Sequence, residues 1–221
     1  MRTDERSHSN SMAESAVSIA LPKTSRLLAA VLARFVEIGH DLSFGPRELI
    51  ADDHSGQMRA ILVRNHDLPT YVDHGIAGLG ICGSDVLGEA SGRFLRLHQF
   101  EFFGGMFCLA AKRGATLEHI MSDDSEFTIA TSYPRFTRGY FSRQGVPTEI
   151  IRLTGSVELA PVLGLADCIV DIVETGATLA AHDLEVIERM EPTAIHLIAN
   201  PAYYKLHFSA VDRLVSRLAA Q

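Results

Sequence analysis

The stretch CIVDIVETGATL, residues 168–179, contains the clearest structural signal in the chain. Cys168 to Val173 are apolar except for Asp171, which is typical of a buried strand, and a helical pattern follows the Thr175-Gly176 turn. Ligands of open α/β sheets bind beyond the carboxyl ends of the strands. A glycine there lets the backbone approach an anion, and successive N–H groups with threonine hydroxyls can cradle a phosphate.

The acidic residues of this stretch are expected to bind a different part of a ligand from the glycine turn. Asp171 and Glu174 would repel a phosphate, so they suit ribose hydroxyls or Mg²⁺ better. The alternative interpretation is an ordinary strand-to-helix turn with an aspartate and a threonine cap. The pattern taken alone favours that alternative.

Short apolar runs alternate with helical patterns along the rest of the chain. Strands are predicted at 17–21, 58–63, 78–82, 93–100, 106–112, 127–131, 148–153, 168–173 and 196–200. Helices are predicted at 27–36, 134–144, 156–163 and 201–219, with short ones opening near Asp67 and at 83–85. This alternation predicts a mostly parallel sheet covered by helices on both faces.

Composition and charge exclude several classes of protein. The 221 residues are 47% hydrophobic and 21% charged, as in globular proteins, and the net charge of −7 disfavours binding to nucleic acid or anionic membranes. No apolar run approaches the roughly 18 residues needed to span a bilayer, and VSIAL (17–21) is too short for a signal-peptide core. Residues 1–16 are expected to form a disordered tail. Cys82, Cys108 and Cys168 lack C-x-x-C spacing, which predicts buried thiols in a reducing cytoplasm.

The surroundings of the first stretch carry a resemblance to a known family. ELAPVLGLADCIVDIVETGATL (158–179) resembles the signature of ATP phosphoribosyltransferase, the first enzyme of histidine biosynthesis, at every fixed position. Four other blocks agree in order: DLPTYVDHG (67–75), GICGSDVL (80–87), IATSYP (129–134) and GSVELAP (155–161). The similarity covers about residues 17–207, and the chain stops where the short form of the family stops.

This resemblance implies a fold, a reaction and a metal requirement. The fold is α/β with two lobes, like a type II periplasmic binding protein, and the active site lies in the interlobe cleft. Residues 17–108 and 191–221 are expected to form lobe I, and 109–190 to form lobe II with the loop for phosphoribosyl pyrophosphate (PRPP). The reaction is Mg²⁺-dependent transfer of phosphoribosyl from PRPP to N1 of ATP, which releases pyrophosphate.

That chemistry makes modest demands on side chains. The lone pair of adenine N1 is already a nucleophile, so no general base is obligatory. The protein must align the two substrates and stabilise the departing pyrophosphate with cations and Mg²⁺. The similarity to the short form also implies a separate regulatory partner that resembles histidyl-tRNA synthetase, around a homodimeric catalytic core in a hetero-oligomer.

The resemblance also implies roles for individual residues. Arg26 and Arg47 are expected to be catalytic by stabilising the triphosphate and pyrophosphate, and Asp171 to meet the metal of Mg-PRPP. The expected PRPP-binding residues are Glu158, Asp171, Glu174, Thr175, Gly176, Ala177, Thr178 and Leu179. The expected ATP-binding residues are Lys23, Arg26, Arg47, Asp67, Gly83 and Asp85.

Several cationic positions of the family are absent. The family lysine of A-T-K-Y-P is Ser132, the usual arginine before that strand is Thr128, and C-R-L is Met106-Phe107-Cys108. The family's K-G-R is Thr24-Ser25-Arg26 when aligned without a gap; alternatively, Lys23 is its lysine, displaced by one inserted residue. Each lost charge-assisted phosphate contact weakens binding by roughly 1.5–3 kcal/mol unless another group compensates. Two alternatives follow: a phosphoribosyltransferase with another acceptor, or a non-catalytic paralogue that binds nucleotides or anions.

Overall fold

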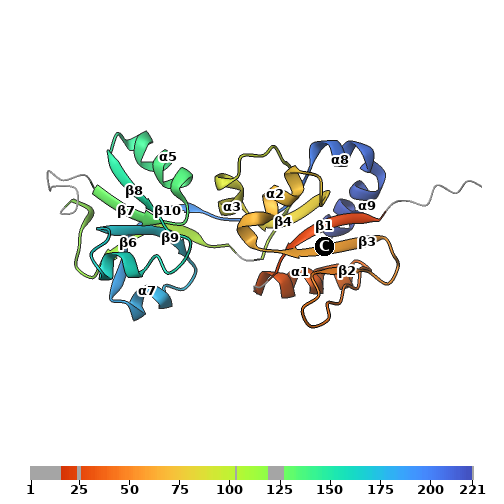
Figure 1. Cartoon of the computed structure of the whole chain (residues 1–221), viewed down its shortest axis with the longest axis horizontal. Helices are drawn as coiled ribbons and strands as arrows, with labels where there is room; N and C mark the ends of the chain where they lie inside the picture. The colour runs from red at the N-terminus through yellow and green to blue at the C-terminus, as the bar shows by residue number, and fades with distance from the viewer. Residues whose placement is uncertain (1–15, 24–25, 103, 119–126, 221) are drawn as a thin grey trace, which may run out of the picture.

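The computed structural model describes residues 16–23, 26–102, 104–118 and 127–220, which form two lobes side by side (Figure 1). Each lobe is built around one mixed sheet, with six strands in the first lobe and five in the second. The predicted two-lobed α/β fold is therefore confirmed. Of the predicted tail, residues 1–15 lie outside the described residues, as do Thr24 and Ser25.

The first lobe holds the six-stranded sheet. Its strands lie in the order β2 (Ile50–Asp52), β3 (Met58–Val63), β1 (Val17–Pro22), β4 (Leu79–Gly83), β11 (Ile195–Ala199) and β5 (Leu95–Phe100). The central strand β1 runs parallel to β3 and β4, and the other neighbouring pairs are antiparallel. The three parallel strands therefore end at the same edge of the sheet.

Alternating side chains of this sheet pack against helices on both faces. Ile19 and Leu21 face α1 (Arg26–Glu37) and α9 (Phe208–Ala219), whereas Ala20 faces α2 (Leu68–Asp73) and α3 (Ser84–Glu89). This alternation is the period-two pattern of a strand buried on both sides. The first lobe also contains the 3₁₀ turn η1 (Asn65–Asp67) and α8 (Pro201–Leu206).

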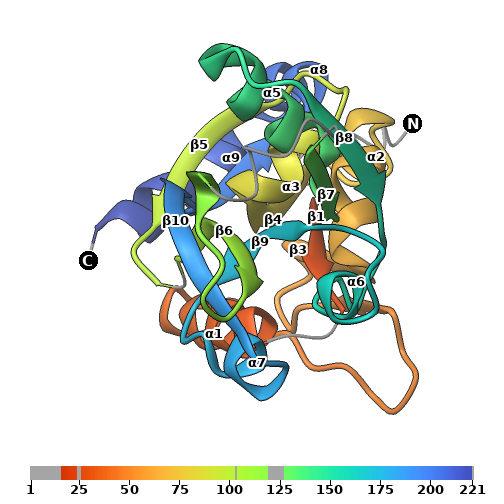
Figure 2. The ribbon, with the colours of Figure 1, turned by 90° about the vertical axis from the view of Figure 1, so that its left-hand side faces the viewer.

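The second lobe is organised in the same way. Its strands lie in the order β10 (Leu184–Pro192), β6 (Met106–Lys112), β9 (Cys168–Val173), β7 (Phe127–Thr131) and β8 (Thr148–Arg152). β7 is parallel to β8 and β9, and β6 is antiparallel to β9 and β10. Figure 2 looks at this lobe from its outer side.

Helices cover both faces of the second sheet as well. Cys168 and Val170 pack with Phe141 of α5 (Pro134–Gln144), and Ile169 packs with α6 (Leu159–Val162) and α7 (Ala177–Ala181). Asp171 follows Ile169 by two residues on β9. It therefore lies on the α6 and α7 face, where Glu158 begins α6.

Several details differ from the sequence prediction. A mostly parallel sheet was expected, but the two sheets are mixed because the chain crosses between the lobes twice and each returning strand runs against its neighbour. β2 and β10 were not predicted; the apolar alternation of β10 is broken by register shifts after Val186 and Arg189. The helix expected over 201–219 is two helices, and the one over 156–163 is only the short α6.

The crossings locate the lobe boundaries. The chain passes to the second lobe between Phe100 and Met106 and returns between Pro192 and Ile195. The expected boundaries at 108/109 and 190/191 fall inside β6 and β10, which pair in the second sheet along their length. The second lobe therefore begins a few residues before the expected boundary and ends a few residues after it.

The three cysteines are free and buried, as predicted. Burial raises the pKa of the Cys82 thiol to about 12, so this group stays protonated at neutral pH. In the described part of the chain, no helix combines the length and the apolar composition needed to cross a membrane.

A buried contact between His40 and Asp53 anchors the segment between α1 and β3, which includes β2. The Asp53 carboxylate contacts Nδ1 of His40 at 2.7 Å and accepts hydrogen bonds from Ser55 Oγ at 2.7 Å, Gln57 N at 2.8 Å and Met58 N at 3.1 Å. Burial alone would raise the pKa of Asp53, but the hydrogen bonds from His40, Ser55 and the two N–H groups outweigh it, and the pKa is lowered.

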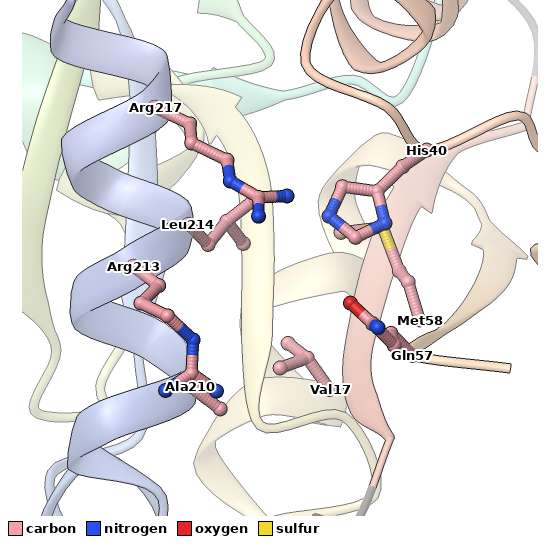
Figure 3. A pocket seen from close by; sticks show the side chains of 8 residues that line it. All are labelled: Val17, His40, Gln57, Met58, Ala210, Arg213, Leu214 and Arg217. Carbon is pink, nitrogen blue, oxygen red and sulfur yellow. The ribbon is translucent and has the colours of Figure 1, made fainter. Parts of the chain in front are cut away.

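The other ring nitrogen of His40 faces a small pocket of about 40 Å³ (Figure 3). Arg213 and Arg217 of α9 point toward it from the opposite wall. This pocket lies at the amino end of β1, beside Val17, and shares no lining residue with the cavity between the lobes. It is therefore separate from the site described below.

We expect Asp53→Asn to lower the free energy of unfolding by about 2 kcal/mol at pH 7, because it removes a charged hydrogen-bond acceptor from a buried site. A lowered native pKa stabilises the fold above the unfolded value near 3.8, and this contribution disappears as pH falls through the native pKa. The difference between wild type and variant should therefore shrink below pH 4 in urea titrations. Asp52→Asn, at an exposed neighbour, is the control and should change stability less; an equal loss in both variants would contradict the assignment.

Candidate functional site between the two lobes

A cavity of about 790 Å³ lies between the lobes, at the carboxyl ends of the parallel strands. The first lobe lines it with residues that follow three strands: Lys23 and Arg26 after β1, Arg64, Asn65 and His66 after β3, and Gly83 and Asp85 at the end of β4. The second lobe contributes Ile172 and Glu174 from the end of β9. This is the position at which open α/β sheets bind ligands, and the volume suits a small-molecule site.

A second pocket, of about 250 Å³, adjoins this cavity and contains the 174–179 loop. It shares Arg26, Ile172 and Glu174 with the larger cavity, so the two spaces form one continuous site. Gly176 has a φ of 76°, the left-handed conformation that glycine adopts without strain, and begins α7. Thr175 Oγ1 accepts a hydrogen bond from Ala177 N at 3.5 Å. The loop therefore has the open backbone and hydroxyls that a phosphate cradle requires.

Two carboxylates from opposite lobes belong to this site: Asp85 is buried, and Asp171 is half-buried. Burial raises the pKa of Asp171, and the neighbouring Glu158 and Asp85 raise it further, against a hydrogen bond from Ile172 N at 2.8 Å. Burial also raises the pKa of Asp85, partly offset by backbone N–H groups, by Tyr133 and by the nearby His66. A bound cation would favour the ionised forms of both carboxylates.

Tyr133 links the two lobes at Asp85. Its hydroxyl donates to Asp85 Oδ2 at 3.3 Å, and its ring packs edge-on against Phe107 with centroids 5.1 Å apart. Burial, together with the charges of Asp85 and Asp171, raises the pKa of Tyr133 far above its usual value. The phenol therefore remains a hydrogen-bond donor at any physiological pH.

Arg26 and Glu174 form the second link across the cleft, through an ion pair between Arg26 Nη2 and Glu174 Oε2. The side chains are 75% and 47% exposed, so this ion pair contributes little to stability. Its partners are also the residues shared by the two pockets. An anion that enters between them can therefore replace Glu174 on the guanidinium at small cost.

The donor set fits Mg²⁺ only together with phosphate ligands. Within the described ranges, no group of three His, Cys, Asp or Glu side chains is arranged to hold a metal ion. Mg²⁺ commonly uses one or two carboxylates and completes its shell with water and substrate phosphates. Asp171, half-buried and beside Glu158, has the chemistry of such a single-carboxylate ligand.

The structure brings most of the predicted site residues together. Lys23, Arg26, Gly83, Asp85 and Glu174 line the larger cavity, and Glu158, Asp171 and 174–179 line the smaller pocket. Arg47 and Asp67 line neither of them. Arg47 is exposed in the loop before β2, with φ 72°, and Asp67 is exposed at the end of η1.

Other residues of the cavity were missed by the sequence analysis. Arg64, Asn65 and His66 directly follow the confirmed strand β3, so the rule about strand ends, applied there, would have found them. Gly105 and Thr193 belong to the crossings and carry no local signal. They pair through N–H···O bonds in both directions, at 2.8 Å from Thr193 N and 2.9 Å from Gly105 N to Thr193 Oγ1. A Cβ at Gly105 would come within 2.3 Å of Ile172, so glycine permits this close approach.

The non-cationic replacements have ordinary structural roles. Thr128 lies at the start of β7, where its N–H donates to Asp167 at 2.9 Å, at the end of the strand opposite to Tyr133. The Ser132 hydroxyl donates to Leu153 O at 2.9 Å. Phe107 is buried and stacks on Phe136 with centroids 3.8 Å apart. Lys23, Arg26 and Arg64 leave the cavity with cations of its own.

The fold and site together define a two-lobed α/β protein of the periplasmic-binding-protein type, with a candidate anion loop in the interlobe cleft. An alkanesulfonate-binding protein from Xanthomonas axonopodis pv. citri shares this fold, with a TM-score of 0.58 at 13% identity over 92% of this chain and 72% of that chain. The family model of ATP phosphoribosyltransferase matches residues 64–220. The chain belongs to the ATP phosphoribosyltransferase family.

Individual relatives agree with this membership. An ATP phosphoribosyltransferase from Geobacillus kaustophilus is 44% identical over 174 residues, which are 79% of this chain and 82% of that protein. A chain of the ATP phosphoribosyl transferase (HisG:HisZ) complex from Thermotoga maritima superposes with a TM-score of 0.79 at 32% identity. That superposition covers 91% of this chain and 96% of the other.

We expect Gly176→Ala to weaken PRPP binding about tenfold and to lower the free energy of unfolding by about 1 kcal/mol, because alanine is strained at positive φ. Isothermal titration calorimetry with PRPP and urea denaturation measure the two effects. Gly139→Ala in α5 is the matched control: its added methyl would meet only Arg143 Nη1, at 3.6 Å, and PRPP binding should not change. Unchanged PRPP affinity in Gly176→Ala would show that the loop does not hold the phosphate.

Proposed function

We propose that the interlobe site carries out Mg²⁺-dependent transfer of phosphoribosyl from PRPP to N1 of ATP, the first step of histidine biosynthesis. One observation carries this proposal: the 174–179 loop and the cationic cavity share Arg26 and Glu174, so a phosphate in the cradle lies next to a second ligand. The family membership supports the reaction, and the two adjoining pockets support a separate site for each substrate.

The two pockets differ in size and chemistry, which separates the substrates. The smaller pocket combines the phosphate cradle with Glu158 and Asp171, which suit the phosphate and ribose hydroxyls of PRPP. The larger cavity, with Lys23, Arg64 and His66, suits the adenine and triphosphate of ATP. Arg26 lies at the junction of the two pockets. There, pyrophosphate leaves C1′ of PRPP and N1 of adenine attacks the same carbon.

The residues of the chain act by alignment and charge stabilisation. The bond between C1′ and the pyrophosphate oxygen breaks as the bond to N1 forms, and negative charge develops on the leaving group. Arg26 offers N–H donors to that charge once its contact with Glu174 is replaced. Mg²⁺ bound with PRPP supplies further neutralisation of the pyrophosphate, and Asp171, assisted by Glu158, is the residue we propose to hold it.

A partner subunit and a compartment complete the proposal. The solved relative from Thermotoga maritima is a HisG:HisZ complex, which supports a regulatory partner for this chain. We propose that this partner resembles histidyl-tRNA synthetase and joins a homodimeric catalytic core. The three free thiols support function in the reducing cytoplasm.

We expect Arg26→Ala to lower pyrophosphate release about 100-fold in the presence of PRPP, ATP and Mg²⁺, because it removes the cation at the junction of the pockets. A coupled pyrophosphate assay, with and without the candidate regulatory partner, measures this. The control Arg59→Ala removes an exposed arginine that pairs with Asp52 on the first sheet, and it should retain full turnover. Turnover of Arg26→Ala within twofold of wild type would place the leaving group elsewhere.

The structure favours Arg64 over Arg47 as an ATP-binding residue, whereas the sequence analysis named Arg47. Arg64 lines the cavity and Arg47 does not, so Arg64→Ala should lower kcat/KM for ATP about tenfold, and Arg47→Ala should lower it less. Steady-state kinetics with ATP varied at saturating PRPP compares the two variants. A larger loss in Arg47→Ala than in Arg64→Ala would contradict this assignment of the ATP cavity.

A further inference from the structure

Glu89, the last residue of α3 in the first lobe, caps the first turn of α5 in the second lobe. Its carboxylate accepts hydrogen bonds from Arg135 N at 3.0 Å and from Phe136 N at 2.9 Å. The residue that precedes α5, Tyr133, makes no side-chain cap of its own, and the first turn of α5 contains no acidic residue. The free N–H groups and the positive end of this helix are thus satisfied by a carboxylate from the other lobe.

The Arg135 side chain in turn binds the carboxyl end of α3. Its Nη1 donates to the carbonyl oxygens of Glu89 at 3.2 Å and of Ala90 at 2.6 Å. The negative end of α3 therefore meets a cation, and the positive end of α5 meets an anion. Four hydrogen bonds between these two short segments fix their distance and orientation across the interface.

This contact lies close to the active-site cavity but outside it. Glu89 and Arg135 line an interlobe space of about 430 Å³ that shares His66 with the larger cavity, but neither Glu89 nor Arg135 lines the two pockets proposed for the substrates. Asp85 lies four residues before Glu89 on α3, and Tyr133 lies two residues before Arg135. The cap thus holds the helices whose neighbouring residues form the Tyr133–Asp85 contact in the site.

The contact differs in kind from the Arg26–Glu174 link between the lobes. Arg26 and Glu174 are substrate-facing and exposed, so substrates compete for them. Glu89 bonds chiefly to backbone groups of a helix terminus, which no substrate in the proposed pockets reaches. It can therefore keep the two lobes aligned while substrate replaces Glu174 as the partner of Arg26.

We propose that Glu89 is a positioning residue for phosphoribosyl transfer: by capping α5 across the interface, it holds the lobes in the closed arrangement that sets the PRPP loop against the ATP cavity. This inference rests on the proposed function for its kinetic consequence. The closure itself is a physical property that can be measured without turnover.

Glu89→Ala and Glu89→Gln test this role by two readouts. Glu89→Ala should lower kcat for pyrophosphate release about tenfold and increase the radius of gyration of the substrate-free protein in small-angle X-ray scattering. Glu89→Gln should have values of kcat and radius of gyration between those of wild type and Glu89→Ala. Its amide oxygen can accept a hydrogen bond from one N–H group, but its amide NH₂ cannot accept one from the other. Circular dichroism melting shows whether each variant is folded, and Glu89→Gln carries the test if Glu89→Ala is not.

Glu191→Ala is the matched control. It removes a glutamate that pairs with Arg143 at 2.8 Å within the second lobe, so kcat and the radius of gyration should equal those of wild type. A loss of kcat without expansion, or expansion without a loss of kcat, would overturn the proposal. If the wild type shows no turnover, the proposed function fails, and an unexpanded Glu89→Ala in scattering would then separately overturn the closure role.

Discussion

The approach of carboxylates from both lobes is the constraint on which the site depends. Asp85 of the first lobe is buried and Asp171 of the second is half-buried, and the charges of Glu158 and Asp85 both act on Asp171. Ionised carboxylates so close together repel each other unless donors or cations balance them. Tyr133 supplies a donor, and Lys23, Arg26 and Arg64 supply positive charge nearby. A substrate that brings Mg²⁺ and phosphates fits this arrangement because it adds both signs of charge.

Besides the Tyr133–Asp85 hydrogen bond, three contacts between described residues connect the two lobes. Backbone pairing of Gly105 with Thr193 joins the crossings, and this pairing needs glycine because the crossings pass against Ile172. The Arg26–Glu174 pair is exposed and exchangeable, whereas the contact of Glu89 with α5 is made to a helix terminus. The first contact connects the lobes, the second can capture substrate, and the third aligns the lobes.

Much of the fold could be predicted because the strands are short, apolar and continuous. β3, β6, β7 and β9 have the predicted limits, as does α5 between Pro134 and Gly145. β10 was missed because bulges interrupt its alternation, and strand direction was missed because no local pattern records that the chain returns between lobes. The site was predicted only in part for the same reason. The 174–179 loop has a local sequence signature, whereas Arg64 and His66 join the site only because the sheet places the end of β3 there.

The order of neighbouring residues is enough to establish the family and to predict the alternation of strands and helices and the candidate anion loop, because each of these is a local pattern in the chain. Which charges meet is a property of the folded molecule. Folding placed Arg26 against Glu174, Tyr133 against Asp85 and Glu89 on the end of α5, and it left Arg47 outside the cavity. These contacts join residues 46 to 148 positions apart, so their distances follow from how the two lobes pack and not from any local pattern.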